Sequence, residues 1–72
     1  MHAVAKQDGT LASAKFTTEE LALELKRSPA TLMRWRRQRI GPPYIRLQGR
    51  VLYDRNQVES WLHAQTVSSG ER

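Results

Sequence analysis

Four arginines crowd into a stretch of six residues near the middle of this chain, at Arg34, Arg36, Arg37 and Arg39. No acidic residue lies three or four positions from any of them, so a helix through this stretch would carry uncompensated like charges. Guanidinium groups bind anions, and arginine in particular bridges guanine edges and phosphates. The pattern therefore favours contact with nucleic acid over an ordinary solvated face.

The chain offers little for catalysis or for binding a metal ion. It has no cysteine, and its two histidines, His2 and His63, have no second ligand at a suitable spacing. Asp54 and Glu59 could form a carboxylate pair, but we expect the first to cap a helix and the second to lie on an exposed face. No serine has a histidine base near it in the sequence, and no glycine-rich phosphate-binding loop occurs. We expect a protein that is not an enzyme and that uses no cofactor and no metal.

Length and charge place the chain among small basic domains. It has 72 residues, a formal net charge of +5 and a pI near 10.5, which points to an anionic partner. No run of residues is apolar for long enough to cross a membrane, and the first residues lack the apolar segment of a secretory signal. We expect a cytoplasmic, nucleoid-associated protein without membrane contact.

The arginines should lie on one helix of about three turns, from Ser28 to Arg39. Ser28 can accept a hydrogen bond as N-cap, and Pro29 suits the first helical position because no N–H is needed there. Gly41 is expected to stop the helix, and the two prolines that follow lack N–H donors. A helix of this length suits insertion into the major groove of B-DNA.

The two sides of this helix differ in composition. Leu32 and Trp35 share one side at helical spacing, and we expect both in the core. Arg34 and Arg37 lie on the other side and are best placed for base edges, whereas Arg36 lies near the core boundary and is expected to hold a phosphate. The helix positions expected to contact nucleic acid are Ser28, Ala30, Thr31, Met33, Arg34, Arg36, Arg37 and Gln38.

An earlier helix should precede the basic one. Thr17 and Glu20 have the spacing of a capping box, so this helix is expected to begin at Thr17 and to end near Lys26 or Arg27. Few residues then remain before Ser28. The two helices must therefore cross sharply, as in a helix-turn-helix.

Beyond Pro43 the apolar period falls to two, which predicts a small hairpin with strands at residues 44–47 and 50–53. Gly49 permits a positive φ in its turn. A hairpin beside a recognition helix is called a wing. The wing positions expected to contact nucleic acid are Arg46, Gln48, Gly49 and Arg50.

The remaining elements complete one domain. Asp54 is expected to cap a last helix, with Gln57 in the reciprocal position. We expect mobile arms at residues 1–15 and 64–72 and a single compact domain at residues 16–63, mostly α with a small β-hairpin, that is, a winged helix-turn-helix. The predicted core consists of Phe16, Leu21, Leu25, Leu32, Trp35, Ile45, Leu47, Val51, Tyr53, Val58, Trp61 and Leu62.

From Phe16 to Leu62 the order of elements resembles the small winged-helix excisionases, also called recombination directionality factors, of the MerR-like helix-turn-helix group. The turn Leu25-Lys26-Arg27 departs from the pattern, since the family usually has a small residue or glycine there. The matching pieces are residues 16–22, 28–32, 34–36, 41–44, 53–54 and 58–62.

The resemblance implies that the basic helix enters the major groove while the wing reaches the neighbouring minor groove or the backbone. It also implies that several copies bind double-stranded DNA side by side and bend it, and that the protein assists a tyrosine recombinase (integrase) in excising a mobile element. The positions that match the family's DNA-binding residues are Thr31, Arg34, Arg36, Arg37, Arg46, Gly49 and Arg50.

Two other functions stay open at this stage. A small transcriptional regulator of a mobile element would use the same fold on a promoter. An interaction module could instead dock its basic helix on an acidic protein, but an interaction face needs apolar anchors among its charges, and only Met33 offers one.

Overall fold

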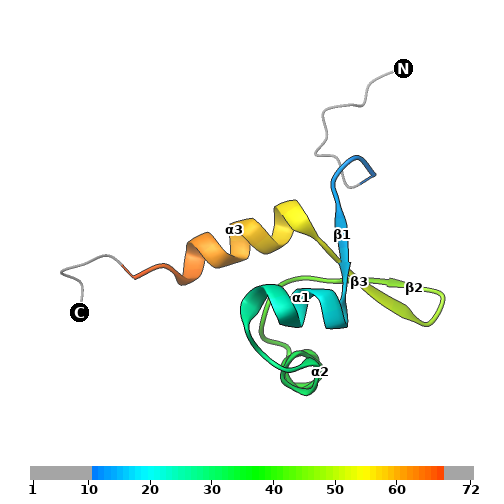
Figure 1. The fold of residues 1–72 in the computed structure, drawn as a ribbon, viewed down its shortest axis with the longest axis horizontal. Coiled ribbons are helices and arrows are strands. Elements are labelled where there is room, and N and C mark those ends of the chain that lie inside the picture. The colour runs from blue at the N-terminus through cyan, green and yellow to red at the C-terminus, as the bar shows by residue number, and fades with distance from the viewer. Residues whose placement is uncertain (1–10, 68–72) are drawn as a thin grey trace.

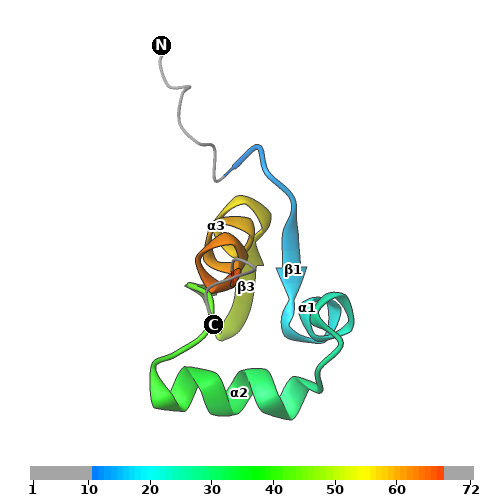
Figure 2. The ribbon, with the colours of Figure 1, turned by 90° about the vertical axis from the view of Figure 1, so that its left-hand side faces the viewer.

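The computed structural model describes residues 11–67. In this part of the chain three helices and a three-stranded antiparallel sheet form the winged helix-turn-helix fold that the sequence predicts. Figure 2 shows α2 beneath α1 and α3, with β1 beside α1. The elements, labelled in Figure 1, are β1 (Lys15–Thr17), α1 (Thr18–Leu25), α2 (Pro29–Gln38), β2 (Ile45–Leu47), β3 (Arg50–Asp54) and α3 (Arg55–Gln65).

The two ends of α1 set the crossing with α2. At its start the predicted capping box is confirmed: the Glu20 amide donates to Thr17 Oγ1 at 3.1 Å and the Thr17 amide donates to Glu20 Oε1 at 2.9 Å. At its end Lys26 has a φ of 59°, and its amide donates to the Leu23 carbonyl at 3.2 Å. Lys26 thus makes the left-handed turn that glycine usually makes.

The caps of α2 explain its length. The Ser28 hydroxyl accepts from the Thr31 amide at 3.2 Å, as predicted for the N-cap. The helix ends at Gln38, and Arg39, with a φ of 62°, makes the left-handed turn. The expectation that Gly41 stops the helix is therefore wrong, because a residue with a side chain adopts that conformation two positions earlier.

Gly41 instead allows close packing in the loop after α2. It has a φ of +88°, and a Cβ built on it would lie 2.8 Å from Trp35 Cε3. Trp35 also contacts Trp61 of α3, with ring centroids 5.7 Å apart. Both tryptophans therefore serve internal packing, in agreement with the prediction.

Strands β2 and β3 form the predicted hairpin, with Leu47 opposite Arg50. Between them Gln48 and Gly49 have φ values of 48° and 79°, and a type I′ turn requires a positive φ at both central residues. Only the glycine was expected in this conformation. The turn twists the strands in the sense that the sheet favours.

A third strand, β1, was not expected from the sequence. It pairs with β3, which becomes the central strand, with Lys15 opposite Asp54 and Phe16 opposite Tyr53. The sequence placed Lys15 in an arm of residues 1–15. Parts of both predicted arms, residues 1–10 and 68–72, lie outside the described residues.

The Asp54 carboxylate joins β1, β3 and α3. One oxygen accepts from the Gln57 amide at 3.2 Å, as predicted for a helix cap, and the other accepts from Ser13 Oγ and lies 3.4 Å from Lys15 Nζ. The carboxyl is almost completely buried, and burial raises its pKa. The hydrogen bonds from Ser13, the Gln57 amide and Lys15, together with the charge of Lys15, outweigh burial and hold the pKa of Asp54 below its ordinary value.

The core lies between the helices and β3. Four residues predicted to belong to it do not: Leu47 is 55% exposed, Leu62 is 41% exposed, and Ile45 and Trp61 are half-buried outside the cluster. Leu47 is the last residue of β2, next to the turn at the tip, and Leu62 lies where α3 opens away from α1. The buried hydrophobic residues are Leu21, Ala22, Leu32, Tyr53 and Val58, and Phe16, Leu25, Trp35 and Val51 pack against them.

Candidate nucleic-acid interface

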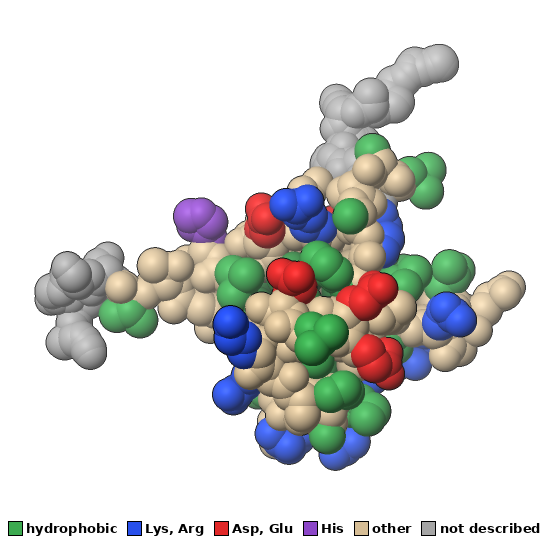
Figure 3. All heavy atoms as spheres, in the orientation of Figure 1, with side chains coloured by type: hydrophobic (Ala, Val, Ile, Leu, Met, Phe, Trp, Pro, Cys, Tyr) green, Lys and Arg blue, Asp and Glu red, His purple; other side chains and the backbone are tan. Residues whose placement is uncertain are grey.

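The outer side of α2 is basic and open to solvent. Leu32 is 0% exposed on the inner side, so the helix cannot rotate without exposing it. Lys and Arg side chains gather at the lower edge of the molecule, over α2, in Figure 3. The predicted site residues that α2 exposes are Ala30, Met33, Arg34, Arg37 and Gln38.

The first turn of α2 contains two further predicted site residues, Ser28 and Thr31. Their hydroxyl oxygens lie 3.1 Å apart, and Ser28 Oγ also caps the helix. Ser28 is exposed, whereas Thr31 is half-buried. Both hydroxyls therefore take part in fixing the start of the helix.

Arg36 differs from the other arginines of α2 because it is bonded within the domain. Its side chain is half-buried, and Nη1 donates to Tyr53 Oη at 2.7 Å and to Thr18 Oγ1 at 3.2 Å. These bonds connect α2 to the central strand and to the first residue of α1. The sequence predicted the position of Arg36 near the core boundary but not these partners.

Tyr44 extends this connection to the hairpin. The guanidinium carbons of Arg36 and Arg46 each lie 5.7 Å from the centroid of its ring, and the Tyr53 ring lies 6.2 Å away. Cation–π contacts of this kind contribute about 0.5–1 kcal/mol at exposed sites. We name Thr18, Arg36, Tyr44, Arg46 and Tyr53 the arginine–tyrosine cluster.

Tyr44, Tyr53 and Thr18 were not predicted from the sequence to belong to the site. The sequence could have indicated the contact between Tyr44 and Arg46, because residues two positions apart in an extended segment share a face. The contacts of Arg36 join residues that are 17 and 18 positions apart, and no local pattern indicates them.

The hairpin tip is open on all sides. Its four predicted site residues are exposed, and a Cβ added to Gly49 would meet no atom within 4 Å. The tip can therefore approach a DNA backbone closely without a change in the core. These four residues are Arg46, Gln48, Gly49 and Arg50.

Charge is separated within the part of the chain that the structure describes. Its exposed carboxylates all lie on α1 and α3, and neither α2 nor the hairpin tip carries one. Phosphates can approach α2 and the tip without meeting a like charge there. The exposed carboxylates are Glu19, Glu20, Glu24 and Glu59.

Within residues 11–67 no group of three or more histidine, aspartate or glutamate side chains could hold a metal ion, and no helix is long and apolar enough to cross a membrane.

A basic second helix after a sharp turn, followed by a basic wing, defines the class of helix-turn-helix DNA-binding proteins. A family model described as "Helix-turn-helix domain" matches residues 16–66, well over half of the chain, and the chain belongs to this family. No curated protein and no solved structure matches the chain significantly. Double-stranded DNA is accordingly its partner.

Proposed function

We propose that this protein is a DNA-bending excisionase, or recombination directionality factor, that binds specific duplex sites and assists a tyrosine recombinase in excising a mobile element. The observation that carries the DNA-binding part is the exposed basic side of α2 beside an open basic hairpin. In this arrangement α2 enters the major groove and the hairpin reaches the adjacent minor groove or backbone.

The arginines divide the work of recognition. Arg34 and Arg37 contact base edges, since both lie on the exposed side of α2, and Arg46 and Arg50 contact phosphates from the hairpin. Arg36 acts as a positioning residue through the arginine–tyrosine cluster, because its Nη1 is bonded to Tyr53 and Thr18. This role replaces the phosphate contact expected from its place on the helix.

Two observations support the excisionase assignment. Residues 16–62 resemble the small winged-helix excisionases, and the helix-turn-helix family to which the chain belongs includes excisionase-like proteins. One small helix and wing read few base pairs, so specific binding calls for several copies side by side. The resemblance to the excisionases also implies that such copies bend the duplex that they cover.

The test of DNA binding is a titration against duplex DNA from the attachment region of the protein's own element, read by gel shift and footprint at 50 and 200 mM salt. If about five basic side chains in all, with Arg46 and Arg50 among them, meet phosphates, log K falls with log salt at a slope near −4.5, and binding weakens roughly several hundredfold. We expect stepwise shifted bands over repeated sites. Equal binding to random duplex at both salt concentrations would contradict specific recognition.

A pair of variants separates base contact from net charge. Arg34→Ala combined with Arg37→Ala should relax sequence choice by about 1–3 kcal/mol per base contact. Arg55→Ala removes one charge, as each single variant does, and is the matched control for the single variants, because Arg55 is an exposed arginine of α3 that pairs with Glu59 at 3.4 Å. A footprint unchanged by the double variant would refute the assignment of this side of α2.

A reconstituted reaction tests the excisionase role itself. With purified recombinase and attachment-site DNA, addition of the protein should stimulate excision over integration. Specific binding that leaves excision unchanged but represses a promoter within the footprint would instead identify a transcriptional regulator with the same DNA-binding surface.

A further inference from the structure

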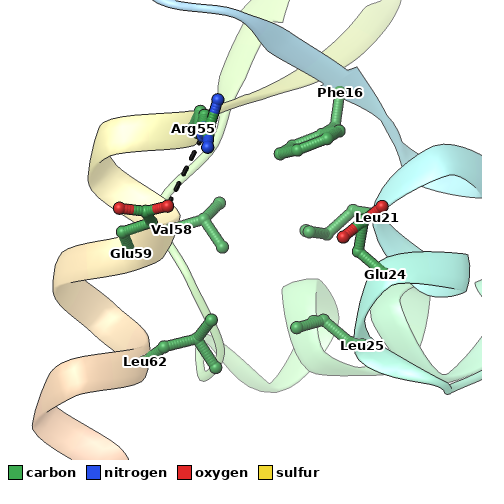
Figure 4. A pocket seen from close by; sticks show the side chains of 8 residues that line it. All are labelled: Phe16, Leu21, Glu24, Leu25, Arg55, Val58, Glu59 and Leu62. Carbon is green, nitrogen blue, oxygen red and sulfur yellow. Dashed lines mark hydrogen bonds and ion pairs between the residues drawn. The ribbon is translucent and has the colours of Figure 1, made fainter.

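A groove opens between α1 and α3 (Figure 4). These two helices lie above α2 in Figure 2. Its volume is about 340 Å³. Leu21 and Val58, both buried, form its floor, and Phe16, Leu25 and Leu62 form its apolar walls. Leu62 is 41% exposed although it lies on the inner side of an amphipathic helix, so the groove leaves apolar surface in contact with water.

Carboxylates border this apolar surface. Glu24 of α1 and Glu59 of α3 line the groove from opposite sides, and Arg55, which also lines it, is paired with Glu59 at 3.4 Å. The other two exposed carboxylates of the described residues, Glu19 and Glu20, also lie on α1. In Figure 3 acidic side chains surround apolar ones over α1 and α3. Because Arg55 is paired with Glu59, the charged residues that line the groove carry a net charge of −1, which favours a cation over a phosphate in a protein of net charge +5.

We propose that this groove docks an amphipathic helical segment of a partner protein, with apolar side chains between the walls and lysine or arginine side chains against Glu24 and Glu59. Helices bind apolar grooves through side chains spaced three or four residues apart, and complementary charges on the rim set orientation and select the partner. The groove is wide enough for a few such side chains, and its border matches basic ones.

The placement of the groove suits a protein that is bound to DNA. With α2 and the hairpin on the duplex, α1 and α3 remain accessible, and this orientation is the one point that rests on the proposed function. The exposed apolar residue of the hairpin, Leu47, lies between Arg46 and Arg50 and would be occupied at the DNA. A partner segment from another protein is therefore a better occupant than the hairpin of a neighbouring copy.

The test uses two synthetic helical peptides of equal length with leucine at positions i, i+3, i+4 and i+7, one with lysine and one with glutamate at the remaining positions. Binding to the full-length chain is measured by calorimetry and by NMR shifts of backbone amides. The lysine peptide should bind at least tenfold more tightly than the glutamate peptide, with shifts concentrated on α1 and α3. Equal binding of both peptides, or shifts concentrated elsewhere, would overturn the proposal.

Variants at exposed leucines provide the matched control. Leu62→Ala should weaken binding of the lysine peptide at least fivefold, whereas Leu47→Ala, at another exposed leucine outside the groove, should leave it unchanged. Glu24→Gln combined with Glu59→Gln should remove most of the preference for the lysine peptide. If Leu62→Ala binds like the wild type, the groove is not the binding site and the proposal fails.

Two further measurements separate this proposal from its alternatives. Concentration-dependent dimers in sedimentation that Leu62→Ala abolishes would assign the groove to a second copy and overturn the proposal. Gel shifts of Leu62→Ala on DNA should match the wild type, which supports separate surfaces for DNA and peptide. A chain that binds the lysine peptide in the groove but binds no DNA would refute the proposed function and leave the groove assignment standing.

Discussion

Helix α2 and the β2–β3 hairpin both present arginines, but the two elements are held in different ways. α2 buries Leu32 completely and packs Trp35 against Trp61. The tip half of the hairpin has exposed side chains, including Leu47 at 55%, and depends on strand pairing. In the proposed interface, stability and DNA contact are therefore coupled in α2, where one helix serves both, and separable at the hairpin tip.

The largest difference in stability is expected between alanine variants of two leucines, one in α2 and one in the hairpin. Leu32→Ala should lower the free energy of unfolding by about 2–5 kcal/mol, because it removes a completely buried side chain and leaves a cavity. Leu47→Ala should change it by no more than about 0.5 kcal/mol, as is usual at exposed positions. Denaturant unfolding followed by circular dichroism measures both, and similar losses would contradict the contrast between the elements.

Two glycines sharpen the same contrast. Both have a positive φ, but Gly41→Ala would also place a Cβ 2.8 Å from Trp35 Cε3, whereas Gly49→Ala would meet no atom within 4 Å. Both variants carry the strain of the left-handed conformation, about 1–2 kcal/mol, and Gly41→Ala should lose about a further 1–3 kcal/mol from overpacking. Comparison of their denaturant midpoints tests this. Equal midpoints would show that the Trp35 side chain shifts to make room for the added Cβ without loss of stability.

The attachment of the central strand to α3 should depend on pH through Asp54. Its pKa is lowered in the folded state, so the stability contributed by its charge is present above the ordinary Asp pKa of about 3.9 and is lost as the pH falls through the folded pKa. Asp54→Asn keeps an oxygen for the Gln57 amide but has no charge. The stability difference between wild type and Asp54→Asn should therefore shrink in acid, and a constant difference down to pH 2 would refute this assignment.

A smaller loss of stability is expected from removing the hydrogen bond that links α2 to the central strand of the sheet. Tyr53→Phe removes the hydroxyl that accepts from Arg36 Nη1 at 2.7 Å and should lower the free energy of unfolding by about 1–2 kcal/mol. If Arg36 positions the hairpin, this variant also weakens specific DNA binding although Tyr53 is 1% exposed and cannot touch DNA. Arg36→Lys, which keeps the charge but not the planar group, should have the same effect. Undiminished binding by both variants would limit the cluster to a structural role.

Local signals in the sequence predicted much of this fold. Thr17 with Glu20 and Ser28 with Pro29 fixed the starts of two helices, because capping involves groups only a few residues apart. The helical spacing of Leu32 and Trp35 gave the inner side of α2, and by difference its exposed basic side. These are the features that place the arginines.

Features that depend on distant residues escaped prediction. β1 exists because Phe16 pairs with Tyr53, and the inward position of Arg36 depends on the same tyrosine. The left-handed turns at Lys26 and Arg39 had no signal either, since neither residue type favours that conformation. Tertiary contacts decide the first two features, and the sequence pattern along the chain does not reveal them.

The open space around Gly49 also bears on how this domain can diversify. Nothing packs against the turn, and the side chains of residues 46–50 lie in solvent, so added residues at the tip would disturb no buried contact. The entropy of closing a longer loop grows only slowly, by about 0.6 kcal/mol for each doubling of its length. The length and reach of the wing are therefore properties that insertions can tune while the rest of the domain keeps its sequence.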